Sequence, residues 1–473
     1  MDNSEFRKQA HKFVDWMADY LEHVEDYPVK STARPGEITA QIPDSAPATG
    51  ENMDDIFQDF QNIILPGMTH WQHPGFMAYF PANASPPSVL AEMLTSTLAA
   101  QCMSWQTSPA ATELEERMMD WLRQLTGLPE EFVGCIQDTA STATLAALLC
   151  ARERLHKFAT NHSGLSIAGT HTTYASAEVH SSVDKAVRIA GLGSDNLRKI
   201  TVDENFAMNP EDLEHAIESD LNAGCIPTCV VVTLGSTSLS AIDPLRKIGE
   251  ICQKYKIWLH VDAAWAGSAL VLPEFRWMID GIDLADSLVF NPHKWLLTQF
   301  DCSAFFVRDK AALIQTFEIL PEYLKTREGD RVNNYRDWGI QLGRRFRALK
   351  LWFVLRSYGQ EGLQNHLRKH IGFCQDLARK VEDHREFELL APHPLALFCF
   401  RYKPEGLDKE ELDLANERLL EKINDSGKLY LTQTRINGQY ALRFVSGSPT
   451  TEQRHIDEAW ALIQNIALTV TTK

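Results

Sequence analysis

The sequence predicts an α/β protein with a mostly parallel sheet flanked by helices, followed by a small C-terminal α+β domain. Three observations support this expectation. Between about residues 110 and 310, short β-rich apolar runs alternate with helical stretches, a pattern typical of a parallel sheet covered on both faces. A long helix is predicted from near Arg344, and separate strands and helices follow it. The 473 residues are 44% hydrophobic, which is enough for a large core and more than one domain.

The first fifty residues predict a helix and then an arm. Apolar side chains recur at roughly helical spacing over residues 5–24, which favours an amphipathic helix. Four prolines lie between residues 28 and 47, so residues 28–50 are expected to be extended and without regular structure.

Six buried strands are predicted in the alternating region, at 133–137, 171–176, 229–234, 257–262, 287–291 and 303–307. Two further strands, at 428–434 and 440–445, are joined through Asn437-Gly438, a dipeptide that favours the type I′ hairpin turn. This hairpin is expected in the smaller C-terminal domain.

Charge and composition exclude several classes of function. The net charge is −17, from 63 acidic and 46 basic residues, so nucleic acid and anionic membrane surfaces are not expected partners. The N-terminal residues offer no apolar core for a signal peptide, and no apolar run approaches the length of a membrane span. The expected compartment is the cytosol, and the nine cysteines are expected to be reduced and structural.

Lys294 is the first candidate for chemistry. It lies in Ser287-Leu-Val-Phe-Asn-Pro-His-Lys-Trp295, just beyond a predicted buried strand. Desolvation among apolar neighbours lowers the pKa of a lysine and suits it to forming a Schiff base. On this segment alone, a surface lysine at the mouth of a loop is the alternative.

Asp262 is the second candidate, at the end of the hydrophobic run Ile257-Trp-Leu-His-Val-Asp262. Ligands of open α/β sheets bind outside the carboxyl ends of the strands, so this carboxylate is expected to face a site. Capping of the next helix is the alternative. A Schiff-base lysine and an acid for a pyridinium nitrogen together form the protein side of a pyridoxal 5′-phosphate (PLP) site.

Two more segments fit such a site. Residues 133–144 pass from a strand into small hydroxylated residues and then into a helix that reaches about His156. Backbone N–H groups at that helix start, with the Thr139 and Ser141 hydroxyls, would hold a phosphate, although ordinary capping is the alternative. His180 follows another predicted strand, where its imidazole would lie flat on a cofactor ring, and a structural histidine is the alternative.

Five motifs in order carry a family resemblance. They are Gln137-Asp-Thr-Ala-Ser141, His180-Ser-Ser-Val183, Thr233-Leu-Gly-Ser-Thr237, His260-Val-Asp-Ala-Ala264 and Asn291-Pro-His-Lys-Trp295. Together they resemble the group II PLP-dependent amino-acid decarboxylases, and among these most closely the aromatic-L-amino-acid decarboxylases. The likeness spans nearly the whole chain and includes Ala78-Tyr-Phe-Pro81 and Leu342-Gly-Arg-Arg-Phe-Arg347.

The resemblance implies a role for each matching position. Lys294 would bind the cofactor covalently, Asp262 would pair with the pyridine nitrogen, and His180 would stack on the ring. The phosphate would be surrounded by Ala140, Ser141, Asn291 and His293, and the ring would be lined by Thr237 and Ala264. The substrate pocket would take in Tyr79, Phe80, Pro81, Gln101, Met103 and His180.

The resemblance also implies fold type I and a homodimer. The expected parts are an N-terminal helical segment and arm at 1–80 that clasps the partner subunit, a large PLP-binding domain at 81–343, and a small C-terminal domain at 344–473. Departures from the family's animal members at Gln101, Met103 and Trp265 leave the preferred substrate ring open.

Residues 325–335 are polar, with Gly329 as a hinge, and predict a mobile surface lid. Tyr335 matches the family's loop tyrosine, which implies that it donates a proton to the substrate α-carbon. Local packing of this aromatic ring is the alternative.

The implied activity is decarboxylation of an aromatic L-amino acid (DOPA, tryptophan, 5-hydroxytryptophan, phenylalanine or tyrosine) to its amine. Three alternatives stay open. One is oxidative conversion to an aldehyde, and another is decarboxylation of glutamate or histidine, which the aromatic-rich segment 71–80 disfavours. The third is a protein of this fold that has lost activity and binds a partner, which the presence of all four candidate catalytic residues disfavours.

Overall fold

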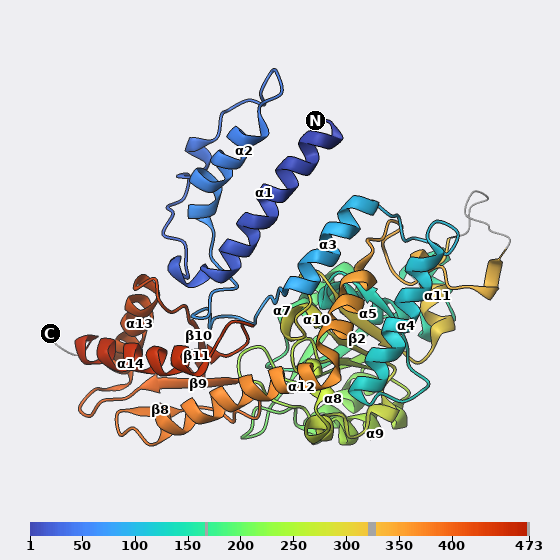
Figure 1. Cartoon of the computed structure of the whole chain (residues 1–473). Coiled ribbons are helices and arrows are strands. Elements are labelled where there is room, and N and C mark those ends of the chain that lie inside the picture. Colours follow the sequence, from blue (N-terminus) through green and yellow to red (C-terminus); the bar gives the residue numbers. More distant parts are fainter. Residues whose placement is uncertain (166–168, 320–327, 471–473) are drawn as a thin grey trace. The chain divides into compact units, whose positions relative to one another are not determined.

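The computed structural model describes residues 1–165, 169–319 and 328–470 and separates into two compact units (Figure 1). The first unit contains Met1–Pro81, Asp376–Leu390 and Cys399–Lys473. The second unit contains Ala82–Gln375 and Ala391–Phe398. The three-part division at 80 and 343 stays a prediction.

The second unit is built on a seven-stranded sheet in the order β1-β7-β6-β5-β4-β2-β3. Its strands are β1 (Val133–Gln137), β2 (His171–Ser176), β3 (Leu197–Ile200), β4 (Ile226–Thr233), β5 (Trp258–Asp262), β6 (Ser287–Phe290) and β7 (Ser303–Val307). Neighbours from β6 to β3 are parallel, whereas β7 is antiparallel to both β6 and β1. The predicted fold class and all six predicted strands are confirmed, but β3 was missed.

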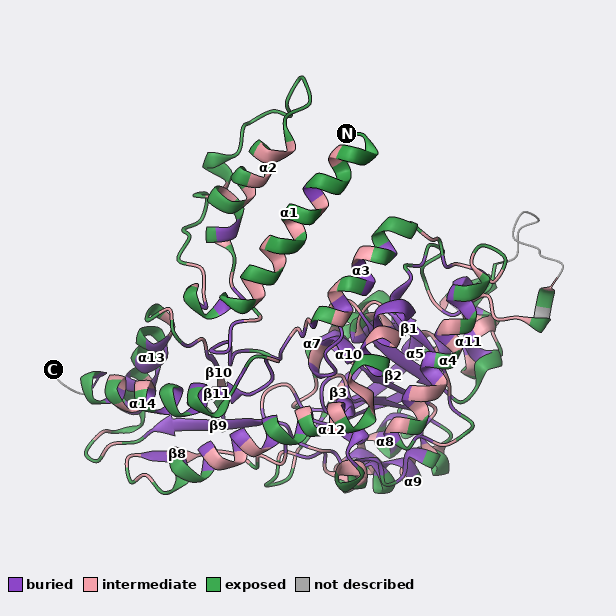
Figure 2. Ribbon diagram, viewed as in Figure 1, coloured by how far each residue is buried: buried purple, intermediate pink, exposed green. Residues whose placement is uncertain are grey.

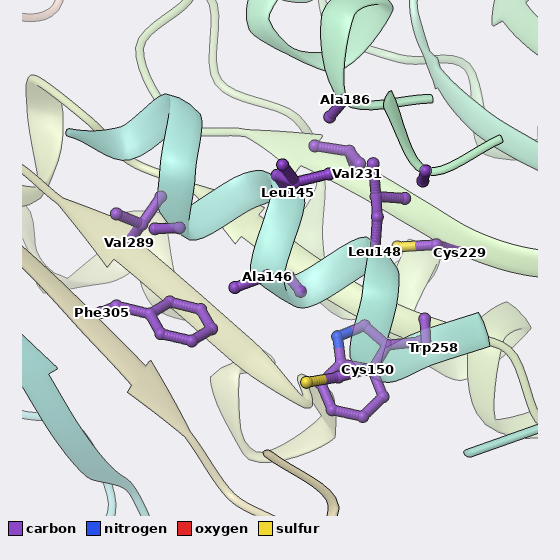
Figure 3. Packing of buried hydrophobic residues seen from close by; sticks show 14 of the residues in the cluster. Leu145, Ala146, Leu148, Cys150, Ala186, Cys229, Val231, Trp258, Val289 and Phe305 are labelled. Atoms are coloured by element: carbon purple, nitrogen blue, oxygen red, sulfur yellow. The ribbon is translucent and has the colours of Figure 1, made fainter. Parts of the chain in front are cut away.

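Several helices of the second unit pack on this sheet, among them α4, α5, α8 and α9. The helices of the unit are α3 (Pro86–Leu98), α4 (Pro109–Thr126), α5 (Ala140–Leu155), α6 (Thr160–Ser163), α7 (Ser181–Ile189), α8 (Pro210–Asn222), α9 (Leu245–Tyr255), α10 (Pro292–Trp295) and α11 (Lys310–Phe317). Helix α5 packs on β4, β5, β6 and β7, and its alanines let it approach the strands closely. Figure 3 shows Leu145, Ala146 and Leu148 of α5 in this core beside Cys229 and Phe305.

A long helix, α12 (Arg347–Glu382), confirms the helix predicted from near Arg344. Gly359 interrupts it with φ of +63°, a left-handed conformation that glycine adopts without a steric penalty. Figure 2 shows buried strands and helices whose outer faces are exposed, as expected for a sheet covered by amphipathic helices.

The first unit contains α1 (Asn3–Glu22), α2 (Met53–Asp59), α13 (Lys409–Asp425) and α14 (Gln453–Val470). Its sheet has the order β10-β11-β9-β8, with β8 (Phe387–Leu389), β9 (Leu397–Tyr402), β10 (Thr432–Ile436) and β11 (Gln439–Val445). The predicted hairpin is confirmed: Ile436 pairs with Gln439, and Asn437 and Gly438 have φ of +50° and +76°.

The predicted N-terminal elements are also present. Asp2 caps α1 by accepting hydrogen bonds from the backbone N–H groups of Ser4 and Glu5. Residues 28–50 contain one short 3₁₀ turn, Thr39–Gln41, and otherwise run without helix or strand. No helix in the described ranges is long and apolar enough to cross a membrane. The cysteines of those ranges form no disulfide.

Candidate active site

The carboxyl ends of three parallel strands bring candidate residues together in the second unit. Asp262 is the last residue of β5 and is paired in register with Thr233 of β4 and Val289 of β6. Directly after β6, the one-turn helix α10 begins and carries Lys294. This is the edge of an α/β sheet at which ligands bind.

The segment that carries Lys294 is fixed on both sides. The Asn291 backbone N–H donates to the Ala264 carbonyl at 2.8 Å, and the Asn291 Oδ1 accepts from the Ser303 hydroxyl at 2.6 Å. His293 Nδ1 accepts from the backbone N–H of Cys302 at 2.9 Å. Asn291 and His293 therefore hold α10 in place, whatever else they bind.

Lys294 lies mostly out of water. Desolvation lowers the pKa of its amine from 10.5 to about 8, although the nearby Asp262 carboxylate raises it in part. With this pKa about a tenth of the amine is unprotonated at pH 7, far more than for an ordinary lysine, and the unprotonated amine is the form that attacks a carbonyl carbon.

Asp262 is buried and held by its own chain. Its Oδ1 accepts from the Ala264 backbone N–H at 3.0 Å, and its carbonyl accepts from the Leu234 N–H at 2.9 Å. The carboxylate therefore accepts from the turn that directly follows its own strand, and it does not cap a following helix, which was the alternative role.

His180 caps α7. Its Nδ1 accepts hydrogen bonds from the Ser182 backbone N–H at 3.1 Å and contacts the Ser182 hydroxyl at 2.9 Å. Because a backbone N–H can only donate, the proton of the neutral imidazole resides on Nε2. Desolvation of the covered part of the ring lowers the pKa of His180, with Asp262 raising it and Lys294 lowering it.

Asp262 and Lys294 both act electrostatically on His180, and Asp262 acts on Lys294, so the three side chains lie near one another. Their roles in binding and catalysis stay predictions. A partly deprotonated amine, a buried carboxylate and a neutral imidazole form one cluster. Their convergence is the feature that any function must explain.

The predicted phosphate-binding segment starts α5 at Ala140. Thr139 occupies the N-cap position, and its side chain does not cap the helix in the described structure. The first N–H groups of α5 therefore point beyond the helix end, a geometry that binds anions. Ala140 is buried and Ser141 is exposed.

Thr237 and Ala264 lie on the turns that follow β4 and β5. The turn after β4 is closed by the Ser236 hydroxyl, which accepts from the Ala241 N–H at 3.1 Å. Ala264 links the ends of β5 and β6, because its N–H donates to the Asp262 carboxylate and its carbonyl accepts from the Asn291 N–H.

Gln101 and Met103 lie in the second unit beside the Leu342–Arg347 motif. The Gln101 Oε1 accepts from the Arg344 N–H at 2.7 Å, and the Met103 carbonyl accepts from the Arg336 N–H at 2.9 Å. A Cβ placed on Gly343 would be 3.2 Å from the Gln101 Nε2, so Gln101 covers the glycine.

Tyr79, Phe80 and Pro81 end the first stretch of the first unit. The Tyr79 hydroxyl lies 3.2 Å from that of Tyr430, and the Arg443 guanidinium lies 5.6 Å from the Phe80 ring centroid. Pro81 packs against Gly447, where a Cβ would approach it to 2.4 Å. Their substrate role stays a prediction.

Tyr335 is buried in the core of the second unit, 2% exposed. Its ring packs edge-on against Trp338 at 5.1 Å and lies under the Arg344 guanidinium at 4.8 Å. Burial raises the pKa of its phenol well above 10.0. Of the predicted lid, residues 325–327 lie outside the described residues, and the proton-donor role stays a prediction.

Two supporting residues, Ser182 and Asp243, were not identified from the sequence. Ser182 orients His180, as described above. Asp243 accepts from the N–H groups of Met208 and Thr233, both at 2.7 Å, and burial raises its pKa to about 7. Only the Ser182 position, two residues after His180 at a helix start, carried a capping signal that could have been used.

Comparisons with known proteins identify the family of the chain. Residues 35–403 match the pyridoxal-dependent decarboxylase conserved domain. The chain belongs to this family. Tryptophan decarboxylase 2 of Oryza sativa subsp. japonica is 42% identical over 100% of this chain and 96% of its own length. Phenylacetaldehyde synthase of Arabidopsis thaliana is 42% identical over 99% and 96%.

A solved structure, that of Oryza sativa TDC with PLP and tryptamine, superposes with a TM-score of 0.97 at 35% identity, covering 100% of this chain and 99% of that one. The pyridoxal-dependent decarboxylase described here is thus a PLP-dependent carboxy-lyase. Its residues fit the cofactor, because the cluster supplies an amine of lowered pKa for the aldehyde and a buried carboxylate for a ring nitrogen.

The lowered pKa of Lys294 predicts a pH-dependent gain in stability for Lys294→Met in the cofactor-free protein. Between pH 8 and 10.5 the unfolded chain binds the proton and the folded chain does not, so wild-type stability rises with pH across this window. Below pH 8 the variant should be more stable by about 3 kcal/mol. Urea unfolding at several pH values measures this, and a gain that persists above pH 10.5 would contradict the assignment.

Proposed function

We propose that this chain decarboxylates an aromatic L-amino acid to the corresponding amine and carbon dioxide. DOPA, tryptophan, 5-hydroxytryptophan, phenylalanine and tyrosine are the candidate substrates. The convergence of Lys294, Asp262 and His180 at the strand ends is the observation that carries the proposal. The aromatic class is supported by relatives named for tryptophan and tyrosine decarboxylation.

Each residue of the cluster has a proposed task. Lys294 would hold PLP covalently, and the charge of Asp262 would hold a proton on the pyridine nitrogen. When bound, PLP would supply the electron sink that decarboxylation needs. Phosphate binding is assigned to the start of α5 and to α10, through Ala140, Ser141, Asn291 and His293, while Thr237 and Ala264 line the ring.

His180 covers the ring face and presents its Nε2–H to the substrate. The tautomer matters, because only Nε2 carries a proton when Nδ1 accepts from Ser182. Desolvation lowers the pKa of His180 most, and Lys294 lowers it further against the opposing effect of Asp262, so the cationic imidazole is disfavoured at this position. The neutral donor therefore orients the substrate carboxylate without neutralising it, which keeps that group ready to leave.

We assign the selection of substrates by ring size to Gly343 and its neighbours. Gly343 adds no side chain, Met103 is flexible, and Gln101 is held by Arg344 with its Nε2 above the glycine. The missing side chain at Gly343 and the flexible Met103 give room for a large ring once Gln101 moves away from the glycine, and the Gln101 amide offers a hydrogen-bond donor to a polar substituent.

A substrate panel tests the proposal. Initial rates should be measured for the five aromatic amino acids, glutamate and histidine, with carbon dioxide and amine quantified together. We expect every productive substrate to be aromatic, with one amine per carbon dioxide. Faster turnover of glutamate than of every aromatic substrate would overturn the aromatic assignment.

Aldehyde formation is the second candidate activity, because a relative at 42% identity is named phenylacetaldehyde synthase. In that reaction the amino acid, dioxygen and water give aldehyde, carbon dioxide, ammonia and hydrogen peroxide. The same panel separates the two activities if ammonia and peroxide are assayed beside amine.

We also propose a cytosolic homodimer. Leu90, Leu94 and Leu98 are about half exposed along α3 at a spacing of four residues, an apolar stripe that a second copy would cover. Residues 1–80 would clasp the partner. The substrate is a small molecule, and no nucleic-acid or membrane partner is proposed.

A further inference from the structure

Trp295, the residue after Lys294, belongs to a buried stack of rings in the second unit. Its indole stacks on that of Trp265, with centroids 4.7 Å apart and planes 17° apart. Its Nε1–H donates a 3.0 Å hydrogen bond to Nδ1 of His370, whose ring is nearly parallel to it at 6°. Trp265 is 1% exposed, and Trp295 and His370 are fully buried.

The direction of this bond is unambiguous. An indole nitrogen only donates, so His370 accepts with Nδ1 and carries its ring proton on Nε2 when neutral. A buried indole N–H without an acceptor is unfavourable, so the bond selects one orientation of the Trp295 side chain. His370 lies on the long helix α12, which gives the acceptor a rigid base.

This orientation bears directly on the lysine. Helix α10 has only four residues, too few to keep its shape through its own hydrogen bonds. Its position depends on anchors, which are Asn291 and His293, described above, and the indole of Trp295, the largest buried side chain of the helix. A shift of the indole would therefore move the backbone of Lys294.

The stack also joins the two halves of the candidate site. Trp295 follows Lys294 by one residue, and Trp265 follows Asp262 by three. Contact between the two indoles thus couples the segment that carries the amine to the segment that carries the carboxylate. Within this pair, Trp295 is the indole that His370 holds, through the hydrogen bond from Nε1–H to Nδ1.

We propose that His370 is a positioning residue that, through Trp295, holds the Lys294 amine in register with Asp262. It acts through Trp295 and is assigned no contact with the reacting atoms or the cofactor ring. The inference rests on the proposed role of Lys294 as the cofactor-binding lysine. The lowered pKa of Lys294, which requires the site to stay dry, is consistent with a tightly held α10.

Three variants of the holoenzyme test it. His370→Phe keeps a buried ring and removes the acceptor. His370→Asn places an amide oxygen where Nδ1 was and restores the acceptor. His366→Phe is the matched control, since it replaces another imidazole one turn earlier on α12, packed 4.3 Å from the His370 ring.

The readouts are kcat, KM, thermal melting and the rate at which bound cofactor is lost, followed by its visible absorption without substrate. We expect His370→Phe to lower kcat by about tenfold to a hundredfold, the size of effect caused by small misplacements. KM should change by less than about threefold. Cofactor loss should be faster, and His370→Asn should recover most of both losses.

Two results would overturn the inference. One is equal loss of kcat in His370→Phe and His366→Phe, which would mean general packing. The other is a lower melting temperature in His370→Phe with unchanged kcat and cofactor release. If no amino acid is decarboxylated at all, the cofactor-release comparison still tests His370, so failure of the proposed function is distinguishable from failure of this inference.

Discussion

Replacing Asp262 with asparagine should lower turnover by at least about a hundredfold, equivalent to about 2.7 kcal/mol, while the fold is retained. The amide oxygen can still accept from Ala264, so the strand end keeps its hydrogen bond. The lost charge is the decisive change, because a neutral amide cannot hold a proton on the pyridine nitrogen. Rates with the best aromatic substrate, at saturating cofactor, measure the effect.

A second readout of the same variant uses the electrostatic coupling. The Asp262 charge raises the pKa of both Lys294 and His180, so its removal should lower both. Asp286→Asn is the control, because it makes the same change at the amino end of β6, where Asp286 accepts from the Leu259 N–H at 2.8 Å. Near wild-type turnover in Asp262→Asn would remove Asp262 from the mechanism.

Tyr335→Phe should change the product rather than stop the reaction. The phenylalanine ring keeps the packing against Trp338 and the contact with Arg344, so stability should change little. The phenol, protonated because burial raises its pKa well above 10.0, is lost as an acid. General acids contribute on the order of a hundredfold to ten-thousandfold, so amine formation should collapse by a factor in this range.

Carbon dioxide release should survive in part in this variant. Without the proton donor, the substrate α-carbon stays electron-rich for longer and reacts with dioxygen, so aldehyde, ammonia and hydrogen peroxide should replace amine. Products per mole of substrate are measured under air and under nitrogen, and the aldehyde should vanish under nitrogen. Unchanged amine output would show that another group delivers the proton and that Tyr335 only packs in the core of the second unit.

Much of the fold was predictable because local patterns and tertiary structure agree. The runs 257–262 and 303–307 are mostly apolar and contain the fully buried strands β5 and β7. Strand β3 was missed because Leu-Arg-Lys-Ile is short, lies at the sheet edge and exposes its central lysine. Nothing in four such residues distinguishes an edge strand from a loop.

The candidate site was predictable to the extent that sheet topology fixes it. Asp262 and Lys294 follow strands whose carboxyl ends meet, so their meeting follows from two correct strand assignments. Long-range partners could not be predicted in this way. His370 lies 75 residues from Trp295, and Tyr335 sits in a polar stretch typical of a surface loop although its ring is buried.

Borohydride reduction of the purified holoenzyme, followed by peptide mapping, identifies the lysine that binds the cofactor. We expect the visible absorption to disappear on reduction and the pyridoxyl group to be found on Lys294, with one group per chain. Lys294→Ala should yield no reduced adduct while retaining the fold. A pyridoxyl group on any other lysine, or an adduct that persists in Lys294→Ala, would contradict the assignment of the active site.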